Sequence, residues 1–299
     1  MNEHQDLDEL PTEARPPDAD YEERSTHDLV RLMNRGDAEV PAAVGRAARE
    51  LAEAIDAIVA RLRRGGRLIY VGAGTSGCIA ELDAAECEST FSTNPGQVVA
   101  LVAGAGAASA AERDAAEDDA AAGAEAVRAM AVSADDAVVA VSASGRTPFV
   151  LGAVERAVAA GALTVAVVSA PESPLARLAE FEIPIVVGAE FVAGSTRLKA
   201  GTAQKLVLNT ISTLTMIRLG KTYGDLMVDV AATNEKLRAR ARRVVRLATG
   251  AQASEVDHAL EEAGGSAKVA IVSLLAGIDA ASARVRLERC GGSVREALR

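Results

Sequence analysis

One stretch of the chain constrains the fold more than any other: residues 67–77, which lead into a helix-like pattern ending near Cys87. An apolar run is followed by small and hydroxylated residues and then by helical spacing, as in a strand that feeds a phosphate-binding loop. Glycines let the backbone approach an anion closely, and the free N–H groups of the following helix carry partial positive charge. We therefore expect Gly74, Thr75 and Ser76 to contact an anionic ligand.

A second loop of the same character follows the apolar run at 137–142. Pro148 favours the first turn of a helix, so the loop before it presents hydroxyls and free N–H groups together. Two such loops favour a shared ligand, and a sugar phosphate fits them better than a nucleoside triphosphate, because both lack the lysine of a Walker loop. The predicted contacts in this loop are Ser142, Ser144, Gly145, Arg146 and Thr147.

The first loop also matches the dinucleotide pattern GxGxxG over residues 72–77. A nicotinamide cofactor would require an acidic residue about 20 positions further on, at the end of the second strand. The residues there are 101–105, which contain no carboxylate, and this disfavours a dinucleotide site. A tight turn with a purely structural role is the other alternative.

Apolar runs alternate with helical segments through the middle of the chain. This alternation predicts a three-layer α/β sandwich, in which a mostly parallel sheet is covered by helices on both sides. Ligands of such sheets lie at the carboxyl ends of the strands. After the opening strand, the further strands are expected near 97–103, 137–142, 163–169 and 183–188.

The remaining pattern divides the chain into an N-terminal arm (1–24), a sugar-phosphate domain with flanking helices (25–236) and a small helical C-terminal unit (237–299). The arm is polar and contains three prolines. Ser25 and Thr26 can cap a helix that runs through Arg35, and 40–64 has the spacing of one long helix. Another long helix is predicted from Lys199 to Leu219, continuing through residues 225–230 towards Asn234.

A third polar cluster covers residues 194–205, where Ser195 and Lys199 are expected to contact an anionic substrate, with Glu190 close by. A solvated helix start is the simpler alternative for this cluster. Glu86 follows the first loop by about two helical turns and is expected to lie within reach of the ligand held there. Glu86 and Glu117 are the candidate catalytic carboxylates, although acidic clusters are usually solvated surfaces. Sequence spacing alone does not show that the two carboxylates meet.

Composition excludes several classes of protein. The net charge is −10 and only 2% of residues are aromatic, with no tryptophan, which argues against a nucleic-acid-binding protein. The three cysteines lack CxxC spacing, so neither a disulfide framework nor a metal site is expected. No apolar run is long enough to span a membrane and no signal peptide is recognisable, so we expect a cytoplasmic protein.

Taken together, these motifs resemble the sugar isomerase (SIS) family and, within it, the N-acetylmuramic acid 6-phosphate etherases. The resemblance runs from Thr12-Glu13 to Asn234-Glu235-Lys236-Leu237 and includes the sequences around 68–77, 82–87, 143–148 and 194–205. It implies a flavodoxin-like SIS domain, a homodimer, a phosphorylated amino sugar as substrate, and no cofactor. It further implies cleavage of a lactyl ether, with Glu86 as the acid that later activates water and Glu117 as the base.

The chain departs from the family pattern at two places. Cys78-Ile79-Ala80 stands where the family usually has Arg-Leu-Gly, and Glu88-Ser89 stands where it usually has Pro-Pro. Such changes can alter substrate fit or the pKa of a neighbouring acid. Two alternatives remain: a sugar-phosphate-binding regulator without catalysis, and an aldose-ketose isomerase of a sugar phosphate.

Overall fold

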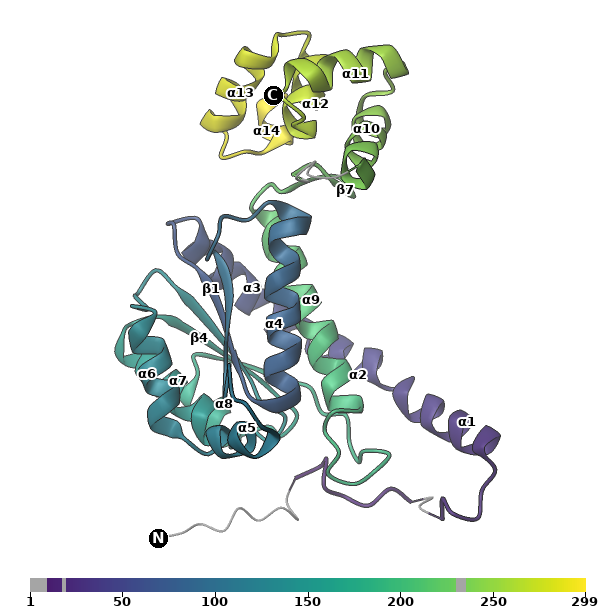
Figure 1. Ribbon diagram of the computed structural model, residues 1–299, viewed down its shortest axis with the longest axis vertical. Coiled ribbons are helices and arrows are strands. Elements are labelled where there is room, and N and C mark those ends of the chain that lie inside the picture. Colours follow the sequence, from purple (N-terminus) through teal and green to yellow (C-terminus); the bar gives the residue numbers. More distant parts are fainter. Residues whose placement is uncertain (1–9, 18–19, 230–234) are drawn as a thin grey trace. The chain divides into compact units, whose positions relative to one another are not determined.

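A five-stranded parallel sheet organises the first part of the molecule (Figure 1). The computed structural model describes residues 10–17, 20–229 and 235–299. The chain divides into two units, of which the first contains 1–84 and 96–211 and the second contains 85–95 and 212–299. The boundaries predicted after residues 24 and 236 stay predictions.

The strand order of the sheet is β2-β1-β3-β4-β5, and all neighbouring strands are parallel. Strands β1, β3 and β4 are buried along their whole length, which is why they appear in the sequence as unbroken apolar runs. This order is that of flavodoxin-like folds, whose ligands bind where the order reverses, beside β1 and β3. The predicted fold class is confirmed. The strands are β1 (Leu68–Gly72), β2 (Val98–Val102), β3 (Ala137–Val141), β4 (Leu163–Val168) and β5 (Phe181–Pro184).

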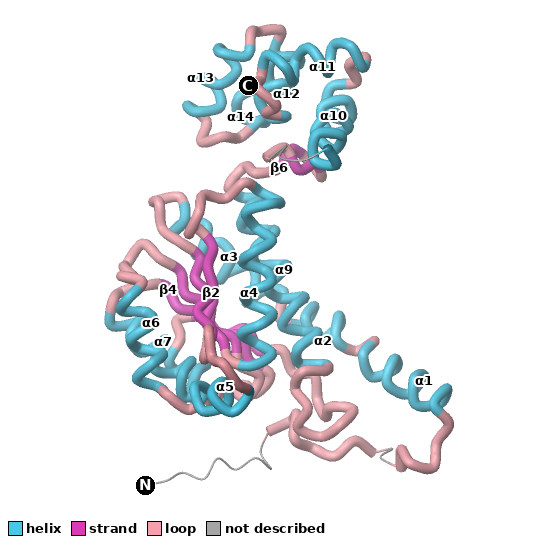
Figure 2. The backbone as a smooth tube through the Cα atoms, viewed as in Figure 1, coloured by secondary structure: helices cyan, strands magenta, loops and turns pink. Residues whose placement is uncertain are grey.

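Helices cover both faces of this sheet (Figures 1 and 2). Ile69 and Val71 of β1 pack into a core with α6 (Ala120–Ala129), α7 (Pro148–Ala159) and α8 (Pro174–Leu178). Tyr70, on the opposite face of the same strand, donates a hydrogen bond of 2.9 Å to Asp83 Oδ2. Its partner belongs to α4 (Gly74–Phe91), which shares that face with α3 (Ala48–Leu62), and α9 (Lys199–Arg218) packs beside the start of α4.

Two predicted elements end differently from the expectation. The single helix predicted over 40–64 is wrong, because the backbone leaves the helical region at Ala47 and forms α2 (Val40–Arg46) and α3. Gly45, a weak helix former, lies two residues before this break. The strand predicted at 183–188 is shifted, since β5 pairs only as far as the end of β4 at Val168.

The helix α9 also stops before its predicted continuation. Gly220 and Gly224 both have positive φ, and such residues terminate a helix and permit a tight turn. A hairpin of β6 (Thr222–Tyr223) and β7 (Leu226–Met227) follows instead of a helix. Asn234, towards which the helix was expected to run, lies outside the described residues. The predicted helix after Ser25 is confirmed as α1 (Thr26–Asp37), with Ser25 Oγ accepting from Asp28 N.

The second unit contains the predicted helical tail, which is confirmed. Its core gathers around α12, and Asp229 after the hairpin accepts a hydrogen bond of 2.6 Å from the buried Lys268 of that helix. None of the described helices is both long and apolar enough to cross a membrane. The helices of the tail are α10 (Glu235–Thr249), α11 (Ala253–Glu262), α12 (Ala267–Ala276), α13 (Ala280–Arg289) and α14 (Val294–Ala297).

Candidate active site

The two predicted anion loops lie next to each other at the carboxyl edge of the sheet. Gly72 at the end of β1 is in register with Val141 at the end of β3. The first loop turns directly into α4 at Gly74, and the second continues through Thr147 into α7 at Pro148. Both loops therefore border the point where the strand order reverses, which is the expected ligand position in this architecture.

Glu117 lies against the first of these loops. It ends α5 (Ala110–Glu117), the short helix that follows β2. A Cβ atom added to Gly74 would lie 2.7 Å from Glu117 Oε1, and Gly74 has a φ of +51°. Only glycine can hold this backbone conformation without strain and leave room for the carboxylate. The structure thus brings Glu117, Gly74 and the N-terminus of α4 together.

The surroundings of Glu117 raise the pKa of its carboxyl group above the ordinary value of 4.5. Burial is the main cause, and the negative charges of Asp114 and Asp118 add to it. Among the described residues, no side-chain hydrogen bond or ion pair engages the carboxylate of Glu117. A partly buried carboxylate with a raised pKa and free lone pairs is suited to accept a proton.

The hydroxyls of the second loop converge on one another. Ser142 Oγ lies 2.9 Å from Thr147 Oγ1 and 3.5 Å from Ser144 Oγ, and it accepts a hydrogen bond from Gly145 N. Ser144 Oγ accepts one from Arg146 N. Hydroxyl groups that satisfy each other in this way can be redirected to the oxygens of a phosphate.

The third polar segment reaches the first loop. A Cβ atom on Gly201 would lie 3.4 Å from Thr75 Cγ2, and Gly201 N donates a hydrogen bond of 2.8 Å to Thr196 O. Ser195, the predicted substrate contact, is half-buried next to Thr196. The turn around Ser195 therefore lies on the side of the site formed by α4 and α9.

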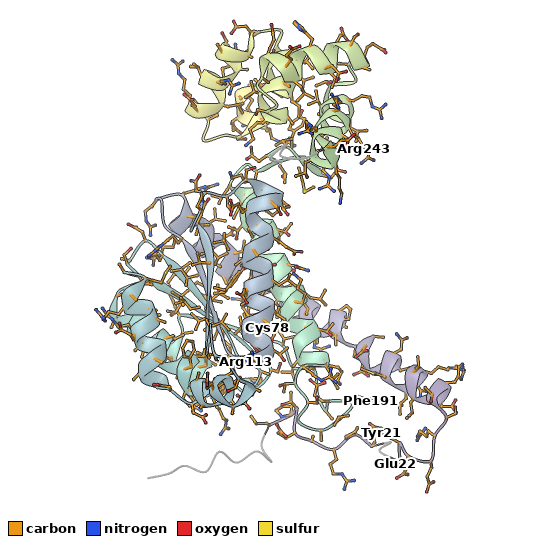
Figure 3. All side chains as sticks on the ribbon, in the orientation of Figure 1. Tyr21, Glu22, Cys78, Arg113, Phe191 and Arg243 are labelled. Carbon is orange, nitrogen blue, oxygen red and sulfur yellow. The ribbon has the colours of Figure 1, made fainter. Side chains whose placement is uncertain are left out.

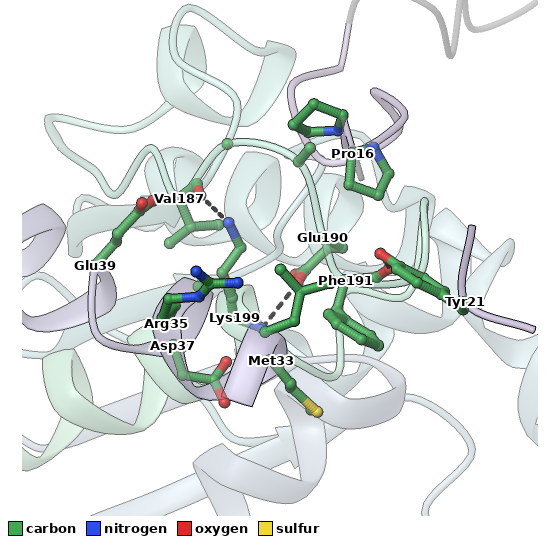
Figure 4. A pocket seen from close by; sticks show the side chains of 15 residues that line it. Pro16, Tyr21, Met33, Arg35, Asp37, Glu39, Val187, Glu190, Phe191 and Lys199 are labelled. Carbon is green, nitrogen blue, oxygen red and sulfur yellow. Dashed lines mark hydrogen bonds between the residues drawn. The ribbon is translucent and has the colours of Figure 1, made fainter. Parts of the chain in front are cut away.

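Glu190 and Lys199 have other surroundings. The fully buried Glu190 accepts hydrogen bonds of 2.8 and 2.9 Å from the backbone N–H groups of Lys199 and Ala200, and so caps α9. Lys199 Nζ donates to Val187 O at 2.7 Å. Both line a cavity of about 410 Å³ together with the N-terminal arm and α1 (Figure 4). No residue of the first two loops lines this cavity, and substrate contacts of Glu190 and Lys199 stay predictions.

Glu86 lies further along α4, in the second unit. Twelve residues separate it from Gly74, and at 1.5 Å per residue this corresponds to about 18 Å along the helix axis. The expectation that Glu86 lies within reach of a ligand on the first loop of the same chain is therefore not supported by helix geometry. Cys78, which departs from the family pattern, is exposed near the start of this helix (Figure 3).

Comparison with known proteins identifies the family. An etherase of N-acetylmuramic acid 6-phosphate from Rubrobacter xylanophilus is 57% identical over 98% of this chain and 97% of its own length. One from Streptomyces coelicolor is 54% identical, covering 98% of this chain and 94% of its own. The chain belongs to the N-acetylmuramic acid 6-phosphate etherase family.

Domain and structure comparisons identify the SIS fold. The model of the glucokinase regulatory protein N-terminal SIS domain matches residues 50–158, and that of the SIS domain matches 119–214. A phosphoheptose isomerase from Francisella tularensis has a TM-score of 0.52 at 18% identity, over 65% of this chain and 100% of its own. At that identity the likeness concerns the fold alone.

One residue at this site was given no role by the sequence. Sequence patterns assign Glu13 nothing beyond a place in the Thr12-Glu13 motif, whereas in the structure its carboxylate lies against Gly194 of the third segment. A polar arm gives no periodic signal from which such a contact could be predicted.

Proposed function

We propose that this chain cleaves the lactyl ether of N-acetylmuramic acid 6-phosphate in the cytoplasm, giving N-acetylglucosamine 6-phosphate and D-lactate during recycling of cell-wall sugars. The proposal is supported by the two full-length relatives above, which are named for this activity. The observation that carries it within the molecule is the half-buried carboxylate of Glu117 beside Gly74 of the first anion loop.

The reaction is an elimination followed by addition of water. In the open-chain sugar, the aldehyde at C1 acidifies the proton at C2, so a base removes that proton while an acid protonates the departing lactate oxygen at C3. Water then adds at C3 of the unsaturated aldehyde, and a proton returns to C2. Two carboxylates in different protonation states are sufficient for these transfers.

In this proposal Glu117 is the base. Burial and its acidic neighbours raise its pKa, which makes the deprotonated carboxylate a stronger proton acceptor than an ordinary glutamate. After the water addition, the same group returns the proton to C2.

We assign the phosphate to the second loop. Ser142, Ser144 and Thr147 offer hydroxyls that lie together, and the loop leads directly into the N-terminus of α7, which favours an anion. Substituting Ser144 by alanine is expected to weaken substrate binding more than it slows the chemical steps.

We assign the acid to Glu86 of a second copy of the chain, in a homodimer. Within one chain, Glu86 lies about 18 Å along α4 from Gly74, which is too far for both to touch one sugar. A dimer with two-fold symmetry allows each copy to complete the site of the other.

The first test is incubation with N-acetylmuramic acid 6-phosphate, followed by measurement of free lactate and of sugar products. Lactate release supports the etherase. Binding without turnover would favour a regulatory protein instead, and a ketose phosphate would favour an isomerase.

Reaction in heavy water then assigns the two carboxylates. The product should carry deuterium at C2. Glu117→Gln should lose both C2 exchange and lactate release, whereas Glu86→Gln should lose release but retain exchange. If Glu117→Gln exchanges the C2 proton at the wild-type rate, the base is another group.

A further inference from the structure

The N-terminal arm is fastened to the segment that contains the third polar cluster. Thr12 is buried, and its carbonyl oxygen accepts a hydrogen bond of 2.9 Å from Gly194 N. Further along, Tyr21 donates through its hydroxyl to Phe191 O at 2.6 Å, and the two rings stack with centroids 4.5 Å apart (Figure 3). The described part of the arm is therefore held at both ends, and Glu13 lies between the two attachments.

The carboxylate of Glu13 repeats the arrangement of Glu117. A Cβ atom on Gly194 would lie 3.1 Å from Glu13 Cδ and closer still to Oε2, and Gly194 has a φ of +75°. Gly74 and Glu117 show the same combination of a left-handed glycine and an adjoining carboxylate. In both cases a carboxylate from another segment occupies the space that a side chain at the glycine would fill.

Glu13 is available to a ligand. It is half-buried, and within the described ranges no side-chain hydrogen bond or ion pair occupies its carboxylate. Such a group ordinarily finds a hydrogen-bond donor. An ionised carboxylate accepts only, so the matching partner is a hydroxyl or an amide N–H group, and not a phosphate or a lactyl carboxylate.

The segment against which Glu13 lies reaches the first loop of the proposed site. Gly194 and Thr196 are two residues apart, at most about 7 Å between Cα atoms. Thr196 O accepts a hydrogen bond of 2.8 Å from Gly201 N, and a Cβ atom added to Gly201 would lie 3.4 Å from Thr75 Cγ2. Glu13 therefore lies against the segment that connects the arm to the first loop.

We propose that Glu13 is a substrate-binding residue, whose carboxylate accepts a hydrogen bond from a hydroxyl or amide N–H group of the amino sugar. This inference rests on the proposed function for the choice of ligand. Because Glu13 belongs to the N-terminal arm, the arm is part of the binding site and not only a segment that precedes the first helix.

The test is the affinity of Glu13→Gln for N-acetylglucosamine 6-phosphate and for glucose 6-phosphate, measured by calorimetry. Loss of a hydrogen bond to a charged group is expected to weaken binding by about 10- to 100-fold and to raise KM more than it lowers kcat. A loss for both sugars assigns a hydroxyl as the donor, and a loss confined to the amino sugar assigns the amide. Unchanged affinity for both sugars would overturn the proposal.

Two variants separate binding from folding. Glu22→Gln changes an exposed glutamate of the same arm and should leave both affinities unchanged. Gly194→Ala displaces the carboxylate while keeping Glu13, and should reproduce the loss, whereas Gly96→Ala adds a Cβ at a similar φ in open space and should not. A lower Tm for Glu13→Gln with full affinity would mean that Glu13 stabilises the fold and does not bind the sugar, and this would also overturn the proposal.

The binding measurement does not depend on turnover. If the wild-type protein binds the sugar through Glu13 but releases no lactate, the etherase function fails and the binding role stands. If lactate is released with Glu13→Gln affinities unchanged, the etherase function stands and the binding role fails.

Discussion

Two carboxylates at this site each lie against a glycine whose missing side chain leaves room for them. Gly74 is paired with Glu117 and Gly194 with Glu13, and both glycines have positive φ. The chemistry of such a carboxylate depends on its neighbours as well as on its position, since burial and nearby charges set its pKa. Two predictions follow from these details.

Gly74→Ala is expected to reduce lactate release on the order of 100-fold, because the new Cβ would lie 2.7 Å from Glu117 Oε1 and would displace the proposed base. Gly96→Ala is the matched control. Its φ of +78° imposes a comparable strain, on the order of 1 kcal/mol, but its Cβ meets nothing within 4 Å. Steady-state kinetics of both variants measures the difference, and equal activities would show that the contact with Glu117 has no role.

Asp114→Asn is expected to move the acid limb of kcat/KM to lower pH. Burial, then Asp114 and Asp118, raise the pKa of Glu117, and a base works only when it is deprotonated. Removing the charge of Asp114 lowers that pKa, so the active form persists at more acidic pH. Asp56→Asn, an exposed change on α3, should leave the pH–rate profile in place. A limb that does not move with Asp114→Asn would mean that another group controls it.

At the scale of elements, the start of α9 depends on a buried carboxylate from outside the helix. Glu190 occupies two N–H groups of the first turn, which otherwise have no partner within a helix. The interaction also benefits from the positive end of the helix dipole. This arrangement explains a buried glutamate without assigning it to catalysis.

Glu190→Ala is expected to lower the free energy of unfolding by about 3 kcal/mol, because two buried donors lose a charged acceptor. Glu190→Gln keeps one acceptor oxygen and should lose roughly half as much. Urea denaturation measures both, with Glu180→Ala as an exposed control. An unchanged urea midpoint for Glu190→Ala would contradict the capping role.

The sequence predicted those elements whose signal is local. Apolar runs mark the buried strands, and the hydroxyl-rich loops before Gly77 and Pro148 follow from turn and helix-start chemistry. The sequence did not predict the break at Ala47 or the hairpin after Gly220, because apolar spacing alone does not show where a single residue leaves the helical region. The contacts of Glu13 and Glu117 depend on how distant segments pack, for which periodicity carries no information.

At the scale of the whole molecule, apolar surface on the first unit remains without a partner in one copy. The helix α1 has no buried residue, Val30 on it is 62% exposed, and Leu82 on α4 is 50% exposed. Single exposed apolar residues are common on monomers, but a helix with no buried residue leaves its apolar side uncovered, which favours association. Together with the length of α4 between Gly74 and Glu86, this uncovered side supports a dimer.

Sedimentation should therefore give about twice the chain mass of 30.7 kDa at micromolar concentration. A sharper measurement mixes the inactive variants Glu117→Gln and Glu86→Gln under conditions that allow subunits to exchange. If each site takes one carboxylate from each copy, half of the reassorted dimers contain one intact site, and about a quarter of wild-type activity should return. A monomer, or a mixture that stays inactive after exchange, would contradict the shared site.

The second unit is assembled from two separate parts of the chain, and this has a consequence for synthesis. Residues 85–95 leave the ribosome roughly 115 residues before Ser212, where the rest of their unit begins. At roughly 5–20 residues per second, the wait is on the order of ten seconds. Cys87 and Phe91, both buried in the finished protein, are without most of their unit during that time. Until the last third of the chain has been translated, these side chains lack most of their unit, and such exposure favours aggregation.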